Sequence, residues 1–176
     1  MKDQVTADRI SKLHPRIREE VTTIVNNIEN SGVGIRIVQG LRTFDEQNNL
    51  YAQGRTQAQL DAVGLKNVKA RPDLPKVTNA RGGESFHNYG LSIDFVLLHA
   101  DKQVSWSQTE DLDKDGKRDW MEVVEAFGCK GYNWGGFWKS PDYPHFEKSY
   151  GLTFQQLLAL KNAGTVDKDG YVLLSV

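Results

Sequence analysis

Two histidines and one aspartate stand out in the sequence because each lies among apolar residues. Asp94 interrupts the run "SIDFVLL", and His87 lies seven residues before it, across the turn-forming "NYG". His145 lies in a second strand-like segment, "PHFE". An ionised carboxylate is costly to bury unless it is paired or binds a metal. Two imidazoles and one carboxylate are the ligand set of an open catalytic zinc site, in which water takes the fourth position.

The alternative is that the two histidines are unconnected, one packed in a core and the other on the surface. Spacing alone leaves both interpretations open, because His-x6-Asp is not a specific pattern. The other two histidines are expected outside any site. His14 precedes Pro15 at the start of a predicted helix, where it would be solvated or cap the helix. His99 ends a predicted strand and is expected to be exposed.

The first half of the chain predicts two helices, a strand and a loop. Residues 15–30 carry apolar side chains at helical spacing, and a β-branched run bounded by glycines follows in "SGVGIRIVQG". Thr43 and Glu46 form a potential capping box, which predicts a second helix that stops at Gly54. Residues 64–84 are polar and rich in proline and glycine, so we expect a long surface loop.

The second half predicts the strand around Asp94, then an acidic turn, a helix over "WMEVVEAFG", and a pair of strands in "GYNWGGFW" and "PHFE". A final helix begins with a second potential capping box, Thr153 with Gln156. Helices and strands do not alternate as in a doubly wound sheet. We therefore expect an α+β fold, a small antiparallel sheet flanked by helices, in a single domain over residues 1–176.

Composition excludes several classes of protein. The 22 basic and 23 acidic residues give a net charge of −1, so there is no general attraction to nucleic acid or to anionic membranes. Cys129 is the only cysteine, which excludes an internal disulfide and a cysteine-rich zinc site. No apolar stretch approaches the roughly 20 residues that span a bilayer. The segment "MKDQVTADRI" lacks the apolar core of a secretory signal, so we expect synthesis in a cytoplasm.

Two motifs together resemble a family of zinc peptidases. "SFHNYGLSID" and, about fifty residues later, "DYPHFE" are similar to the S-x-H-x(6)-D and D/E-x-x-H motifs of this family. It contains D-alanyl-D-alanine carboxypeptidases and dipeptidases and L-alanyl-D-glutamate endopeptidases, including many phage endolysins. The similarity covers about residues 13–150 and includes "GLRTFDEQNNLYAQGRT" and "DWMEVVEAFG". It implies a zinc fold like that of the D-Ala-D-Ala peptidases and hedgehog domains.

The resemblance also implies the roles of individual residues. The zinc ligands fall on His87, Asp94 and His145. The catalytic acidic residue falls on Asp142, and the positive charge near the scissile carbonyl falls on Arg42. One departure is Ser92, where the family usually has alanine, and a hydroxyl is small enough to fit there.

Each of the accompanying residues also has a plainer interpretation. Asp142 would be a turn-capping residue in "SPDYP", and Arg42 would form a surface ion pair at the start of a helix. The resemblance favours the catalytic role for both. Ser85 opens the first motif, and we expect it to bind substrate or to orient a neighbouring group.

A separate acidic loop has the spacing of a calcium-binding EF-hand loop. "DLDKDGKRDWME", residues 111–122, places a glycine at position 6 and carboxylates at the ligand positions. The expected calcium ligands are Asp111, Asp113, Asp115, Asp119 and Glu122. Arg118 occupies a position that is usually apolar, and the preceding "VSWSQTE" is a poor entering helix. The alternative is a solvated acidic turn.

The resemblance implies a bacterial peptidoglycan stem peptide as the substrate. The "NWGGFWKSPDYPHFE" ending is most similar to the L-alanyl-D-glutamate endopeptidases. The alternatives are a D-alanyl-D-alanine carboxypeptidase and a non-catalytic, hedgehog-like binding module. We expect a monomer that binds no nucleic acid and does not insert into membranes. A phage lysin or a bacterial autolysin would act on the cell wall after release from the cytoplasm.

Overall fold

Strand β2 (Ser92–Leu98) is the central strand of an antiparallel sheet, as its apolar sequence predicts. The structure is a computed structural model and describes residues 1–174. The sheet has the order β1-β2-β5-β4, in which β1 is Ile35–Gln39, β4 is Asn133–Trp134 and β5 is His145–Glu147. The short β3 (Val104–Ser105) pairs with the end of β2. All of these pairings are antiparallel, which confirms the predicted class of sheet.

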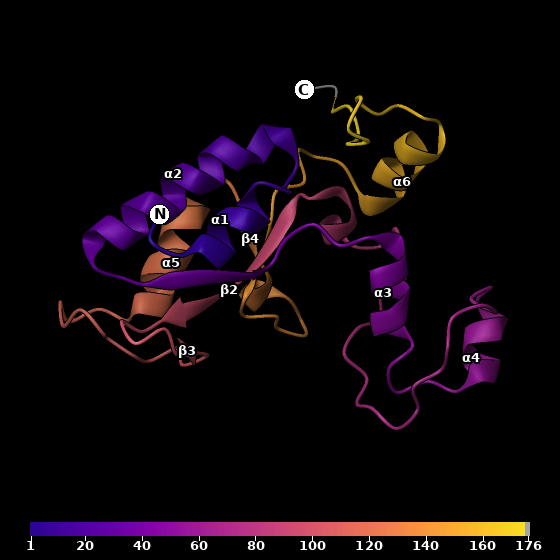
Figure 1. The fold of residues 1–176 in the computed structure, drawn as a ribbon, viewed down its shortest axis with the longest axis horizontal. Coiled ribbons are helices and arrows are strands. Elements are labelled where there is room, and N and C mark those ends of the chain that lie inside the picture. The colour runs from indigo at the N-terminus through magenta and orange to yellow at the C-terminus, as the bar shows by residue number, and fades with distance from the viewer. Residues whose placement is uncertain (175–176) are drawn as a thin grey trace. The chain divides into compact units, whose positions relative to one another are not determined.

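Six α-helices and two short 3-10 helices complete the described elements (Figure 1). The α-helices are α1 (Gln4–Ile10), α2 (Pro15–Ser31), α3 (Phe44–Tyr51), α4 (Gln57–Ala62), α5 (Asp119–Gly128) and α6 (Phe154–Asn162). The 3-10 helices are η1 (Phe86–Tyr89) and η2 (Gly135–Phe137). Both predicted capping boxes are present, at Thr43 and at Thr153. Within residues 1–174, none of the helices combines the length and the apolar character needed to cross a membrane.

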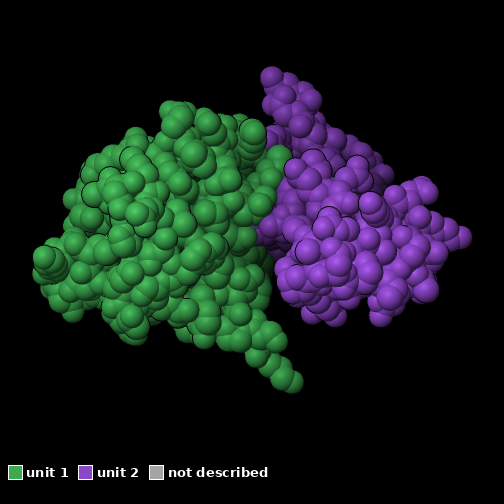
Figure 2. Space-filling view, turned by 60° about the horizontal axis from the view of Figure 1, so that its bottom comes forward, with its two compact units in different colours: residues 1–41, 90–151, 176 green, residues 42–89, 152–175 purple. Residues whose placement is uncertain are grey.

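Backbone contacts divide the described residues into two compact units (Figure 2). Unit 1 consists of residues 1–41 and 90–151 and contains the whole sheet with α1, α2 and α5. Unit 2 consists of residues 42–89 and 152–174 and contains η1, α3, α4 and α6. A single catalytic domain over residues 1–176 remains a prediction.

Aromatic side chains form the core of unit 1. Phe95 of β2 packs against Trp120 of α5, with ring centroids 4.4 Å apart. Phe146 of β5 stacks on Phe127 of α5 at 4.7 Å, and all four side chains are buried. Successive side chains of a strand point to opposite faces of the sheet. Because Phe95 and Phe146 point into this core, the neighbouring polar residue Asp94 and its strand partner point to the other face.

The N-terminal helix α1 was not predicted, and a partly buried ion pair attaches it to the sheet. The Asp3 carboxylate caps the helix and also binds the Arg36 guanidinium of β1 at 2.8 Å. The hydrogen bond from Arg36 lowers the pKa of Asp3 to about 2. His14 was predicted either to be solvated or to cap the helix that follows it. It is buried and is the N-cap of α2, which confirms the capping role.

The predicted loop of residues 64–84 contains no helix or strand element, but it is anchored to its neighbours within unit 2. The Gly54 N–H donates to the carbonyl of Arg71 at 2.8 Å. The buried Arg55 guanidinium donates to the carbonyl of Thr78 at 2.9 Å and lies over the Tyr51 ring, 3.6 Å from its centroid. These contacts hold the loop at Arg71 and Thr78 against the segment between α3 and α4.

Candidate metal centre and catalytic residues

The register of β2 against β5 brings together two of the three predicted metal ligands. Asp94 and His145 are direct partners in this antiparallel ladder, although 51 residues separate them in sequence. The His145 Nδ1 atom lies 3.0 Å from Asp94 Oδ1. The imidazole is 7% exposed and the carboxylate 20% exposed, so solvent reaches the pair only in part. The sheet therefore presents an imidazole and a carboxylate side by side.

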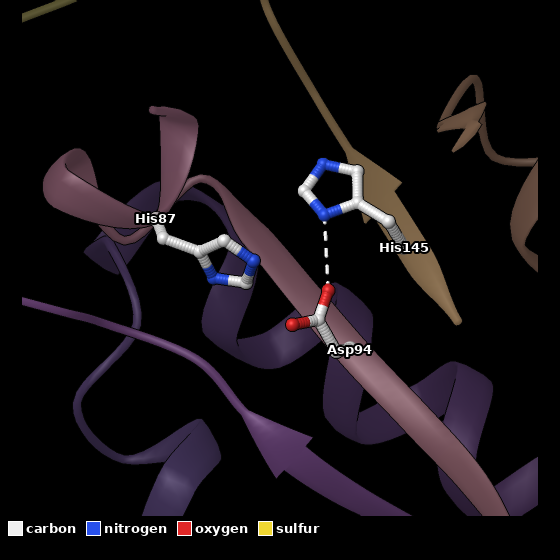
Figure 3. Close-up of side chains that lie close together, drawn as sticks. All are labelled: His87, Asp94 and His145. Carbon is white, nitrogen blue, oxygen red and sulfur yellow. Dashed lines mark hydrogen bonds and ion pairs between the residues drawn. The ribbon is translucent and has the colours of Figure 1, made fainter. Parts of the chain in front are cut away.

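The third predicted ligand, His87, lies on the short helix η1 and is buried. His87, Asp94 and His145 each offer one ligand atom, and these three atoms all lie within 4.8 Å of one another. Figure 3 shows the two imidazoles and the carboxylate gathered in this way, with the dashed line joining His145 to Asp94. Both histidines therefore belong to one group of residues that could hold a metal ion.

The donor chemistry of this group fits a zinc ion. Two buried imidazoles and one carboxylate match the protein ligands of a catalytic zinc site in type and in number. They leave one position for water or substrate.

Hydrogen bonds within unit 2 hold the helix that carries His87. The Ser85 hydroxyl accepts from the His87 N–H at 3.3 Å, so Ser85 supports the first turn of η1. The Asn88 amide donates to the carbonyl of Arg42 at 3.0 Å, and the Arg42 N–H donates to the carbonyl of His87 at the same distance. Arg42 is thus attached to η1 through its backbone. Sequence reasoning missed Asn88, which the motif contains but to which it assigns no chemistry.

The glycine that follows η1 is required by its surroundings. Gly90 has φ of +67°, a conformation that other residues rarely adopt. A Cβ atom at this position would lie 2.7 Å from the backbone nitrogen of His14. The backbone at Gly90 lies close to the backbone at His14 because the His14 N–H donates to the Gly90 carbonyl at 2.9 Å. This contact sets the point where the chain enters β2.

Asp142, the predicted catalytic acidic residue, lies in a turn that leads into β5. Its carbonyl accepts from the His145 N–H at 3.1 Å, and its own N–H donates to the carbonyl of Gly135 at 3.0 Å. A Cβ atom at Gly135 would lie 2.5 Å from the Asp142 carbonyl oxygen, so only glycine permits this approach. The backbone thus fixes the position of Asp142 relative to His145, and the Asp142 residue is exposed.

The second ring nitrogen of His145 also faces a carboxylate. Glu147 Oε2 lies 3.2 Å from His145 Nε2. Burial alone would lower the pKa of His145, but its hydrogen bonds to Asp94 and Glu147 outweigh burial and raise the pKa to about 9. Without a metal the two carboxylates therefore favour a proton on the ring, and a bound cation would compete with that proton.

The predicted calcium ligands form two overlapping groups. Oxygen atoms of Asp111, Asp113 and Asp115 lie within 4.8 Å of one another, and so do those of Asp113, Asp119 and Glu122. The N–H groups of Asp115 and Gly116 donate to the Asp111 carboxylate at 3.1 and 3.0 Å, which folds the loop around its first residue. No helix element directly precedes this part of the described chain, since only β3 lies shortly before the loop.

The structure also shows the surroundings of Ser92 and His99, two further residues that the sequence singled out. Ser92 is fully buried, and its hydroxyl has no hydrogen-bond partner among residues 1–174. His99 is 35% exposed, and its Nε2 lies 3.2 Å from Glu110 Oε2. It therefore forms a histidine–carboxylate pair of its own outside the candidate metal-binding group of His87, Asp94 and His145.

Comparison with known proteins identifies the family. Residues 78–148 match the model of the M15 peptidase family described as D-alanyl-D-alanine carboxypeptidase. The peptidoglycan L-alanyl-D-glutamate endopeptidase CwlK of Bacillus subtilis is 42% identical over 138 residues, which cover 78% of this chain and 74% of CwlK. The chain belongs to the M15 peptidase family. It is therefore a peptidase, as its motifs predict.

A crystal structure of the L-Ala D-Glu endopeptidase ChiX from Serratia marcescens is also similar. The likeness covers 87% of this chain and 90% of that chain, with a TM-score of 0.46 and 20% sequence identity.

Proposed function

We propose that this M15 peptidase is a zinc-dependent endopeptidase that cuts the L-alanyl-D-glutamate bond of peptidoglycan stem peptides. Two observations carry the proposal together. The chain gathers two imidazoles and a carboxylate within 4.8 Å, and it is 42% identical to an endopeptidase named for that bond. The first part supports metal-assisted hydrolysis, and the second supports the choice of substrate.

His87, Asp94 and His145 would hold the zinc. When bound, zinc would lower the pKa of a water molecule and polarise the scissile carbonyl. Asp142 accepts the proton of the attacking water and passes it to the amine of the leaving D-glutamate. Arg42 offers a fixed positive charge to the carbonyl oxygen as negative charge develops there.

The catalytic roles proposed for Asp142 and Arg42 are supported by different contacts. For Asp142, the supporting contact is the turn that fixes its backbone 3.1 Å from the His145 N–H. For Arg42, it is the backbone hydrogen bond to His87 at 3.0 Å. The Arg42 guanidinium donates to Gln47 Oε1 at 2.8 Å, and the Gln47 amide donates to the carbonyl of Ala80. Gln47 would therefore hold the guanidinium in place. A substrate-binding role for Ser85 stays a prediction.

Product analysis separates this proposal from its alternatives. Mass spectrometry of digested peptidoglycan is expected to find new N-terminal D-glutamate, or its amide, and muramyl chains that end in L-alanine. Free D-alanine alone would instead favour a carboxypeptidase, the activity for which the matching family model is named. A zinc-loaded protein that cuts no type of cell wall would favour the binding-module alternative.

We also propose that residues 111–122 bind calcium. Beyond the spacing of the carboxylates, the supporting observation is the Glu122 Oε2 atom, which is buried and has no hydrogen-bond partner in the described part of the chain. A buried oxygen without a partner is costly, and a cation would satisfy it. Burial, followed by the neighbouring carboxylates, raises the pKa of both Asp119 and Glu122. A divalent cation among these groups would offset the repulsion.

Calcium is therefore expected to stabilise the folded protein. Trp120 follows the buried Asp119 and packs on Phe95, so ordering the loop would support the start of α5 against β2. A calcium concentration of 100 times Kd would add about 2.7 kcal/mol to the free energy of unfolding. The measurement is calorimetric titration and melting of zinc-saturated protein, compared with Asp113→Ala combined with Glu122→Gln.

The control for the calcium experiment is Asp169→Ala, in the acidic turn of residues 167–170 outside the loop. It should bind calcium like the unaltered protein. If the unaltered protein and the double variant give the same flat titration and the same melting temperature, the loop is a solvated acidic turn.

A further inference from the structure

The metal-binding group leaves one of its neighbours without an assigned role, the Glu147 carboxylate. It lies on the same strand as His145, two residues further on, and Phe146 between them points into the aromatic core. Alternation along the strand therefore places His145 and Glu147 on one face. Glu147 Oε2 reaches the His145 Nε2 atom at 3.2 Å, while Nδ1 of the same ring faces Asp94 at 3.0 Å.

The backbone around Glu147 is held on both sides. Glu147 is opposite Ser92 of β2 and opposite Asn133 of β4, so β5 is an inner strand at this point. The Phe146 ring lies 4.7 Å from Phe127 and 5.6 Å from Phe95. The next residue, Lys148, donates instead to Glu20, so it does not draw the Glu147 carboxylate away. Glu147 is 17% exposed, which limits competition from water.

This arrangement determines which ring nitrogen can bind a metal. A neutral imidazole carries its proton on one nitrogen and a lone pair on the other. If Nε2 carries the proton and donates it to Glu147, the lone pair is on Nδ1, which faces Asp94. With the opposite tautomer, an N–H group would point at the other ligands, and the ring could not bind. A carboxylate behind a ligating histidine fixes the tautomer, the ring orientation and the basicity of the ligand.

We propose that Glu147 is a positioning residue that holds His145 with Nδ1 directed at the metal. The inference rests on the proposed function, because it takes His145 as a zinc ligand. It goes beyond that function by assigning a role to a residue outside the candidate ligand group.

The experiment measures zinc affinity without any substrate. Metal-free proteins are titrated with zinc in competition with a chromophoric chelator. Glu147→Ala should bind zinc roughly 10–100-fold more weakly, the usual cost of losing such a partner. Glu147→Gln should keep most of the affinity, because its amide oxygen can still accept from Nε2–H. Cobalt-substituted Glu147→Ala should also show an altered visible spectrum, since the geometry of one ligand is no longer fixed.

A matched control exists elsewhere in the chain. Glu110→Ala removes a carboxylate from His99 at the same 3.2 Å distance, outside the metal-binding group. It should bind zinc like the unaltered protein. Melting of the metal-free variants shows whether each is folded before its affinity is compared.

Two results would overturn the inference. Glu147→Ala with unchanged zinc affinity would mean that the contact does not orient the ligand. Glu147→Gln as weak as Glu147→Ala would mean that charge matters and the hydrogen bond does not. An unaltered protein that binds no zinc would overturn the proposed function as well, so the two failures can be told apart.

Discussion

Replacement of His145 by alanine is expected to abolish both zinc binding and peptidase activity. Two donors, His87 and Asp94, would remain where a catalytic zinc site has three protein ligands. The loss should exceed the roughly 10–100-fold effect of removing an outer partner such as Glu147. The Asp94 carboxylate would also lose its neighbour at 3.0 Å and would remain partly buried. Elemental analysis of the purified variant and an assay on peptidoglycan measure the two losses.

His99→Ala is the control for this change. His99 also pairs with a carboxylate, yet it lies outside the metal-binding group, so the variant should retain zinc and activity. A His145→Ala protein that retained a full equivalent of zinc would contradict the assignment of His145 as a ligand.

Replacement of Asp142 by asparagine is expected to leave zinc bound while turnover falls by about 10²-fold or more, the usual contribution of a general base. Asparagine has nearly the same shape as aspartate, but its amide cannot accept the proton of the attacking water. The turn should persist, because the hydrogen bonds to the His145 N–H and to the Gly135 carbonyl use the Asp142 backbone. Zinc content, melting temperature and turnover of the variant are measured together.

Zinc content, melting temperature and turnover together distinguish the possible roles of Asp142. Loss of zinc would make Asp142 a metal ligand. Turnover close to that of the unaltered protein would leave it a turn residue only. Asp45→Asn, an exposed carboxylate in the first turn of α3, should leave both zinc and turnover unchanged.

Local signals in the sequence predicted the larger elements of the fold. The apolar run around Asp94 became the central strand, and the capping boxes at Thr43 and Thr153 began helices as expected. Such signals act over four or five residues, so they can be read without knowing the fold. Helices α1 and α4 were missed because seven and six residues are too few to show a helical period.

The candidate metal-binding group could be predicted only in part. The residue types at His87, Asp94 and His145 indicated the chemistry, but their spacing left them unconnected until the motifs were compared with a family. The cross-strand partner of His145 could not be predicted in the same way. The register of β5 against β2 pairs Asp94 with His145, and register is a property of the folded sheet, whereas Glu147 lies on the face of His145 by alternation along one strand. Asn88 and Gln47 likewise act through contacts with residues distant in sequence.

Activity as a function of zinc added back to the metal-free protein tests the central claim most directly. If His87, Asp94 and His145 form the catalytic zinc site of an L-alanyl-D-glutamate endopeptidase, metal-free protein should be inactive. Release of N-terminal D-glutamate from peptidoglycan should then rise in proportion to zinc and level off at one equivalent per chain. Full cleavage by the metal-free protein in the presence of a chelator would contradict the account.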